Sequence, residues 1–448
     1  MNINWRRQKS QAALTVPKQI DPNSEVARGN LAQSAGRNLL LLSLVVALGF
    51  FGGCTRKASD DLVLLSPGGA QVQALKSLVA EFEREHPGVR VQLVTSPGKD
   101  YYVKSLTMLA GRAHVDVLWI GQGFGIFASR GALMDLQPFI HRDPEFDIGI
   151  FHKKLLGWYR YDDKLYGLPT GADVLAIVYN RDLFDAGGVE IPRDGWTVDE
   201  MVEKAKKLTS HDPSGRVDVV GLGLVDYDYR YHGLRLLDEN HRFALNTEDG
   251  RQWLQRNVDL IYTERVLQRG TAMESMDRLN GFLNQKVAIT EVAPWDLKEL
   301  RDRAMFRWDL APLPSLPGRQ AMGWGSSSGF CIARNSKHPD LAWKLLKKLS
   351  GAELQRAMFD RTMPGISSLY QEYIDYKPGK PSSISVMVKM LEHAEPNTRI
   401  SAYQEVEAEW VYWRDRALLR QISVEEALKQ AESHINRILA LGQKEVAP

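Results

Sequence analysis

The segment Leu62-Val63-Leu64-Leu65-Ser66-Pro67-Gly68-Gly69 is a short apolar run that ends in a turn. Residues 71–85 follow with apolar side chains at helical spacing, and residues 89–94 then alternate between apolar and polar side chains as a strand does. A second helix is expected over residues 100–110 and a third strand over residues 115–120. This β-α-β-α-β alternation predicts a parallel sheet that is covered by helices.

Two glycine-containing loops follow strands of this sheet, at residues 66–69 and 121–123. Ligands of open parallel sheets bind at the carboxyl ends of the strands, so both loops are expected at one binding edge. Gln122 lies in the second loop, and its amide can both donate to and accept from neighbouring hydroxyl groups.

Strands and helices continue to alternate toward the C-terminus. Thr197 and Glu200 form the pattern of a helix capping box, and so do Ser423 and Glu426. Further strands are expected at residues 174–180, 221–225 and 287–290, and further helices at residues 248–264, 276–284 and from Ile384 onward. The chain is therefore predicted to have an α/β fold throughout.

Residues 323–329 are rich in glycine and serine and contain Trp324, and an apolar strand around Cys331 follows them. We expect a loop that carries an exposed tryptophan. A flat aromatic face beside free backbone groups suits a carbohydrate site, because it offers an apolar surface to the ring and partners to the hydroxyls. Cys331 is expected to be a buried thiol without a catalytic role.

The composition is that of a globular protein of two or three domains. The chain has 448 residues, of which 44% are hydrophobic and 25% charged. The net charge of +2 arises in the leader, because the residues before Cys54 carry +4 and the remainder carries −2. No nucleic-acid partner is expected for a mildly acidic body.

An apolar segment precedes Cys54. Arg37 is followed by an uncharged run over residues 39–51 and then by Gly52-Gly53-Cys54. The run is shorter than the roughly 20 residues of a spanning helix, so a secretory signal is expected over residues 1–53. Cys54 resembles the acylated cysteine of bacterial lipoproteins, with residues 54–60 as a membrane tether. The alternatives are an ordinary cleaved signal or an uncleaved anchor.

A set of short motifs recurs along the chain in a fixed order. They are Phe82 to Val91, Val115-Asp116-Val117, Gly131-Ala132-Leu133 with Asp135-Leu136, Lys164 to Pro169 with Tyr179-Asn180, Gly195-Trp196-Thr197, Ala311-Pro312-Leu313-Pro314, and Ser336-Lys337-His338-Pro339 with Ala342-Trp343. In this order and spacing, the chain from about Asp60 onward resembles the bacterial extracellular solute-binding proteins of carbohydrate ABC importers. Relatives in that group bind maltodextrins, other oligosaccharides or glycerol phosphates.

The resemblance implies a periplasmic-binding-protein type II fold, in which two α/β lobes are joined by crossing strands and the ligand lies in the cleft. The crossings are expected near residues 170–174 and 324–328. The lobes are expected to comprise residues 60–171 with 327–375 and residues 172–326 with 376–448.

The resemblance also implies which side chains contact the ligand. Trp295 matches a stacking aromatic of relatives, and Asp173 lies at the first crossing. Trp324 has packing between the lobes as its alternative role, and Asp173 has a purely structural one. Trp196 and Trp343 are expected in the core. The predicted ligand-binding residues are Tyr102, Trp119, Gln122, Asp173, Tyr227, Tyr229, Trp295 and Trp324.

The function implied is sugar capture by hinge closure and delivery to the permease of an ABC importer, outside the cytoplasm, by a lipid-anchored monomer. No enzymatic activity, cofactor or metal is expected, since no HExxH, CxxC or GxxxxGK[ST] motif occurs. One alternative is a non-sugar solute such as a polyamine, a peptide or a glycerol phosphodiester, whose phosphate Gly68-Gly69 with Arg230 or Arg399 would hold. A secreted glycan-processing enzyme using Asp173, Asp226 and Asp228 is the remaining one.

Overall fold

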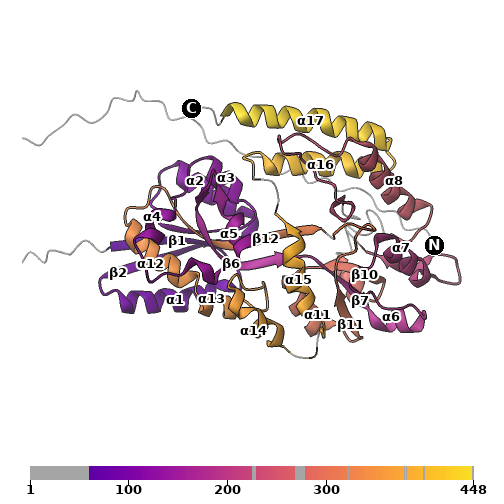
Figure 1. Cartoon of the computed structure of the whole chain (residues 1–448), viewed down its shortest axis with the longest axis horizontal. Helices are drawn as coiled ribbons and strands as arrows, with labels where there is room; N and C mark the ends of the chain where they lie inside the picture. Colours follow the sequence, from indigo (N-terminus) through magenta and orange to yellow (C-terminus); the bar gives the residue numbers. More distant parts are fainter. Residues whose placement is uncertain are drawn as a thin grey trace, which may run out of the picture. The chain divides into compact units, whose positions relative to one another are not determined.

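Two β-sheets organise the chain (Figure 1). The computed structural model describes residues 60–223, 229–267, 278–320, 322–377, 379, 381–396 and 399–445. The expectations for Cys54, for the leader before it, and for Asp226, Tyr227 and Asp228 lie outside the described residues.

The first sheet contains the strands predicted from the N-terminal alternation. Its order is β13-β12-β3-β1-β2, and β6 pairs with β12. β1 runs parallel to β2 and β3, as predicted, whereas β12 is antiparallel to β3 and to β6. The strands are β1 (Asp60–Pro67), β2 (Val89–Ser96), β3 (Val117–Ile120), β6 (Gly167–Val174), β12 (Gly323–Ile332) and β13 (Ala394–Glu395).

Both faces of β1 are buried, which explains its uninterrupted apolar sequence. Leu62 and Leu64 pack into a cluster with the buried face of helix α1 (Gln71–Glu85), including Leu75. Val63 and Leu65 face the opposite way and pack with Tyr101 of helix α2 (Gly98–Ala110). The helix limits predicted for α1 are confirmed.

The second sheet has the order β11-β7-β10-β9-β8. β10 is parallel to β9 and antiparallel to β7, which in turn is antiparallel to β11. The predicted capping box of α7 (Val198–Leu208) is confirmed: the Glu200 N–H donates to Thr197 Oγ1 at 3.1 Å, and the Thr197 N–H donates to Glu200 Oε2 at 2.7 Å. The strands are β7 (Ala176–Asn180), β8 (Ser210–His211), β9 (Val217–Leu222), β10 (Val287–Val292) and β11 (Trp308–Ala311).

The glycine-serine segment is a strand, so the prediction of a loop there is wrong. Gly323–Ile332 forms β12, and Ser326, Ser327 and Ser328 lie opposite Asp173, Ala172 and Gly171 of β6. The backbone groups of this segment are therefore engaged in the sheet rather than free for ligand hydroxyls. The small residues permit close packing: a Cβ at Gly325 would lie 2.6 Å from the Cβ of Ala394.

The two segments predicted to cross between lobes do pair with each other, as β6 and β12 (Figure 1). Helix α15 (Ser385–His393) packs against β6 and β12 and also against β7 of the other sheet. Helices α16 (Tyr403–Leu418) and α17 (Val424–Glu445) pack on each other and on α8 (Glu248–Tyr262).

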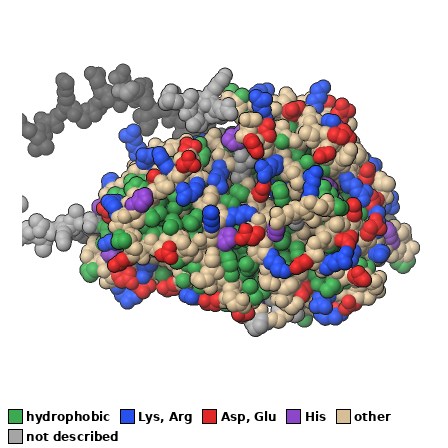
Figure 2. Space-filling view, in the orientation of Figure 1, with side chains coloured by type: hydrophobic (Ala, Val, Ile, Leu, Met, Phe, Trp, Pro, Cys, Tyr) green, Lys and Arg blue, Asp and Glu red, His purple; other side chains and the backbone are tan. Residues whose placement is uncertain are grey.

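The remaining elements are short. They are α3 (Phe124–Ser129), α4 (Gln137–His141), η1 (Ile148–Ile150), α5 (Lys153–Trp158), β4 (Arg160–Tyr161), β5 (Lys164–Leu165), α6 (Arg181–Ala186), η2 (Tyr229–His232), α10 (Arg278–Leu283), η3 (Pro294–Asp296), α11 (Leu297–Arg303), α12 (Pro339–Leu349), α13 (Ala352–Ala357), η4 (Ser367–Leu369) and α14 (Tyr370–Asp375). None of the helices in the described part of the chain combines the length and apolar character that crossing a membrane takes. Basic and acidic side chains are interspersed on the face shown in Figure 2.

Candidate ligand-binding site

The tryptophan cavity, of about 240 Å³, is lined by Trp119, Asp173 and Trp295, three of the predicted ligand-binding residues. Trp295 lies in the 3-10 turn η3 directly after β10. The Asp296 carboxylate accepts the Ala293 N–H at 2.9 Å, which holds the turn. The Trp295 indole is left 37% exposed and meets Trp324 edge-on, with ring centroids 6.1 Å apart.

Asp173 supplies the acidic group of the tryptophan cavity. Its Oδ2 accepts a hydrogen bond from Ser326 Oγ at 3.4 Å, whereas its buried Oδ1 has no partner within the described residues. Burial raises the pKa of Asp173 to about 6, although the hydroxyls of Thr362 and Ser326 oppose the shift. A buried acceptor without a partner costs about 1–3 kcal/mol, and a ligand hydroxyl would remove that cost.

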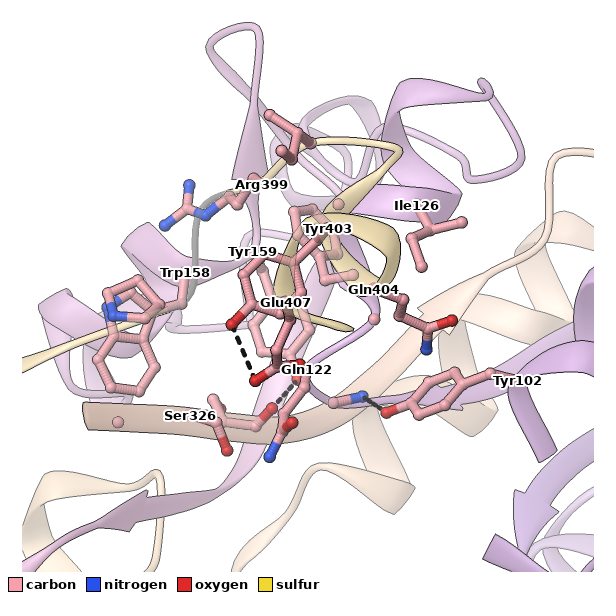
Figure 3. A pocket seen from close by; sticks show the side chains of 18 residues that line it. Tyr102, Gln122, Ile126, Trp158, Tyr159, Ser326, Arg399, Tyr403, Gln404 and Glu407 are labelled. Atoms are coloured by element: carbon pink, nitrogen blue, oxygen red, sulfur yellow. Dashed lines mark hydrogen bonds between the residues drawn. The ribbon is translucent and has the colours of Figure 1, made fainter. Parts of the chain in front are cut away.

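The glutamine cavity, of about 100 Å³, contains Gln122 and Tyr102 (Figure 3). Tyr102 Oη accepts the Gly121 N–H at 3.2 Å, and burial raises the pKa of Tyr102 to about 12. Tyr403 and Glu407 enter from α16, and Tyr403 Oη donates to Glu407 Oε1 at 3.3 Å. The cavity thus offers amide, hydroxyl and carboxylate groups beside aromatic rings.

The tryptophan and glutamine cavities adjoin each other. Ser326 lines the glutamine cavity and donates to Asp173, which lines the tryptophan cavity. Tyr102 and Trp119 also belong to different cavities, and their ring centroids are 6.4 Å apart. The two cavities therefore share a wall made of side chains.

A third space, which we name the charged cavity, measures about 410 Å³ and is lined by Tyr229. The Tyr229 ring is 9% exposed, meets Trp253 edge-on at 5.7 Å, and lies under the Arg230 guanidinium at 4.6 Å. Most of its surface is thus used in packing. Arg235 also lines this space and is paired with Glu395 at 2.9 Å.

Trp324 is not among the residues that line these three cavities. It is partly buried against the core and meets Trp295 edge-on. Ligand contact and packing between the lobes both stay predictions for Trp324.

The predicted core residues are confirmed. Trp196 is 1% exposed and donates to the Pro312 carbonyl at 2.8 Å, and Trp343 is 5% exposed and donates to Asp143 Oδ2 at 2.8 Å. Cys331 is buried, and burial raises the pKa of its thiol.

Several lining residues were missed by the sequence analysis: Tyr403, Gln404 and Glu407 of α16, together with Arg361 and Thr362 in the tryptophan cavity. Gln404 and Glu407 are exposed polar residues of α16, whose buried residues include Val406 and Trp410, and no local pattern marks them as site residues. No group of three or more possible metal ligands occurs among the described residues.

Residues 67–356 match the family of bacterial extracellular solute-binding proteins. The chain belongs to this family. A binding protein of Brucella abortus is 26% identical over 278 residues, which cover 59% of the present chain and 65% of that protein. The maltodextrin-binding protein of Bacillus subtilis is 21% identical over 381 residues, and the alignment covers 81% of the present chain and 87% of that relative.

Solved structures establish the fold of this solute-binding protein as periplasmic-binding-protein type II, with two α/β lobes. An ABC substrate-binding protein of Listeria monocytogenes, solved in complex with cycloalternan, superimposes with a TM-score of 0.74. The alignment covers 85% of the present chain and 99% of that structure at 23% identity. A sugar-binding protein of Xanthomonas citri gives a TM-score of 0.72 at 20% identity, covering 86% and 98%.

Proposed function

We propose that this solute-binding protein captures a sugar or oligosaccharide in the tryptophan and glutamine cavities and delivers it to an ABC importer. A sugar has apolar ring faces and a rim of hydroxyls. Trp119 and Trp295 offer aromatic surface to the faces, and Asp173, Gln122 and Glu407 offer partners to the rim. The names of the maltodextrin-binding and arabinooligosaccharide-binding relatives point to the same class of ligand.

The observation that carries the proposal is the buried Asp173 Oδ1, which accepts no hydrogen bond from the described residues and lies in a cavity with two tryptophans. Ionised, this oxygen is a hydrogen-bond acceptor only, so it requires a donor such as a hydroxyl. A glycan-cleaving enzyme would need two carboxylates flanking the bond. Asp173 is the only carboxylate that lines the tryptophan cavity among the described residues, which favours binding over cleavage.

Capture proceeds by hinge closure in this proposal. The lobes are residues 60–171 with 327–375 and residues 172–326 with 376–448, joined where β6 pairs with β12. Asp173 and Ser326 lie on those strands, and Trp295 follows β10 of the other sheet. A ligand that contacts both lobes favours the closed state by its difference in affinity for the two states.

The cellular setting is part of the proposal. Members of the family are extracellular by description. We infer that Cys54 is the acylated N-terminal residue of the mature chain, that residues 54–60 tether it to the membrane, and that it acts as a monomer with the permease as its partner.

A phosphate-bearing solute is the second candidate. Arg361 lines the tryptophan cavity and, within the described residues, forms no ion pair. Gln71, the first residue of α1, lies in the same lining, and a helix N-terminus favours anions. A glycerol phosphodiester fits these groups better than a polyamine, because the cavity presents one carboxylate beside an arginine.

The test is a thermal-shift screen of the purified mature chain against monosaccharides, oligosaccharides, sugar phosphates and glycerol phosphodiesters. We expect neutral sugars to raise the unfolding temperature. A shift only with phosphate-bearing compounds favours the second candidate, and no shift with any sugar contradicts sugar binding.

A further inference from the structure

The charged cavity adjoins the glutamine cavity. Tyr403 and Pro396 line both spaces, so the two have a common wall. The glutamine cavity adjoins the tryptophan cavity through Ser326 and Asp173. The glutamine cavity therefore lies between the tryptophan cavity and the charged cavity. The charged cavity has the largest volume of the three, about 410 Å³.

The two ends of this series differ in chemistry. The tryptophan cavity presents aromatic rings and one buried acid, whereas the charged cavity presents several ionic side chains, of which Arg235, Glu395 and Lys154 already have partners. Arg235 Nη2 lies 2.9 Å from Glu395 Oε1, and Lys154 Nζ donates to the Glu392 carbonyl at 2.6 Å. The side chains of Arg235 and Glu395 are still 55% and 36% exposed, so they keep hydrogen-bonding capacity for a ligand.

We propose that the ligand is an oligosaccharide whose chain extends from Trp295, past Tyr403, to the Arg235–Glu395 pair. This inference rests on the proposed function and adds chain length to it. A single sugar would leave the charged cavity unused, and the affinity therefore increases with the number of sugar units. Arg235 acts only on the distal units, since it lines the charged cavity and neither of the other two.

The test begins with binding of the purified mature chain to a glycan array that includes monosaccharides and chains up to hexasaccharides. The strongest binder is then compared by calorimetry with its own shortened forms. We expect the full chain to bind about tenfold more tightly than its terminal monosaccharide, or better. Equal affinity overturns the length inference alone, whereas no binding to any glycan contradicts the proposed function.

Arg235→Ala locates the distal contact. We expect about fivefold weaker binding of the longest chain and unchanged binding of the shortest, because the lost hydrogen bonds belong to the distal units. The matched control is Arg142→Ala, which breaks an exposed ion pair with Asp340 away from the three cavities. Glu395→Gln is a second variant that keeps the shape of the pair. Full affinity for the longest chain in both Arg235→Ala and Glu395→Gln overturns the inference.

Discussion

Replacing Trp295 with alanine removes an indole that lines the tryptophan cavity and is 37% exposed. An indole side chain covers about 250 Å² at most, so about 90 Å² is available to a sugar face. At about 25 cal/mol per Å², covering that area contributes about 2 kcal/mol. The expected result is a dissociation constant about 30-fold higher for the sugar identified by the screen.

Isothermal titration calorimetry measures this change, and circular dichroism confirms that the variant is folded. Some loss of stability is expected, because the edge-on contact with Trp324 contributes about 0.5–1.5 kcal/mol. Tyr412→Ala is the matched control, since Tyr412 is a 51% exposed aromatic residue of α16 outside the three cavities. An affinity unchanged by Trp295→Ala in folded protein would refute the assignment of the tryptophan cavity.

Three further outcomes are expected. The pKa of Asp173 is raised from 3.8 to about 6 in the folded chain, so the folded state binds the proton more tightly than the unfolded state. Its contribution to stability is therefore full below pH 4 and is lost as the pH rises through 6, by about 3 kcal/mol. Chemical unfolding should show this fall in stability for the wild-type chain but not for Asp173→Asn. The sugar affinity of the wild-type chain should rise over the same pH range as the carboxylate forms. Parallel pH profiles of stability for the wild-type chain and Asp173→Asn would contradict the prediction. Trp343→Ala removes a ring that packs against Phe139 and Phe146, so the free energy of unfolding in urea should fall by about 3–5 kcal/mol. The sugar affinity of the folded fraction should not change. Lys344→Ala serves as the control, and an equal loss of stability in both variants would speak against the packing argument. Cys54→Ser should move the protein from the membrane to the soluble fraction on cell fractionation, and retention in the membrane would exclude lipidation at that residue.

The layout of the first sheet could be predicted because its signals are local. Leu62 to Leu65 are apolar in succession, since helices cover both faces of β1, and the spacing of Leu75 and Leu78 marks the covering helix. The capping box at Thr197 likewise fixes the start of α7 through hydrogen bonds within four residues. In such cases the residues that determine the structure are close together in the chain.

The glycine-serine segment was misassigned because its structure depends on distant residues. Gly323, Gly325 and the serines have low strand propensity, yet they form β12 since β6, β3 and β13 supply hydrogen-bonding partners. Gly325 is needed because Ala394 and Trp158 approach it closely, and nothing near it in sequence reveals this.

The candidate site was predictable only in part for a related reason. Trp119, Asp173 and Trp295 follow from the resemblance, and the structure brings them into one cavity. Tyr403 and Glu407 lie more than 100 residues farther along the chain, so their place beside Gln122 results from packing that the local sequence does not encode.

A crystal structure of the mature chain with its sugar tests the central claim most directly. We predict a sugar ring stacked on Trp295, with one hydroxyl donating to Asp173 Oδ1. A ligand seated outside the tryptophan and glutamine cavities, or a sugar that leaves Asp173 Oδ1 without a partner, would contradict the account.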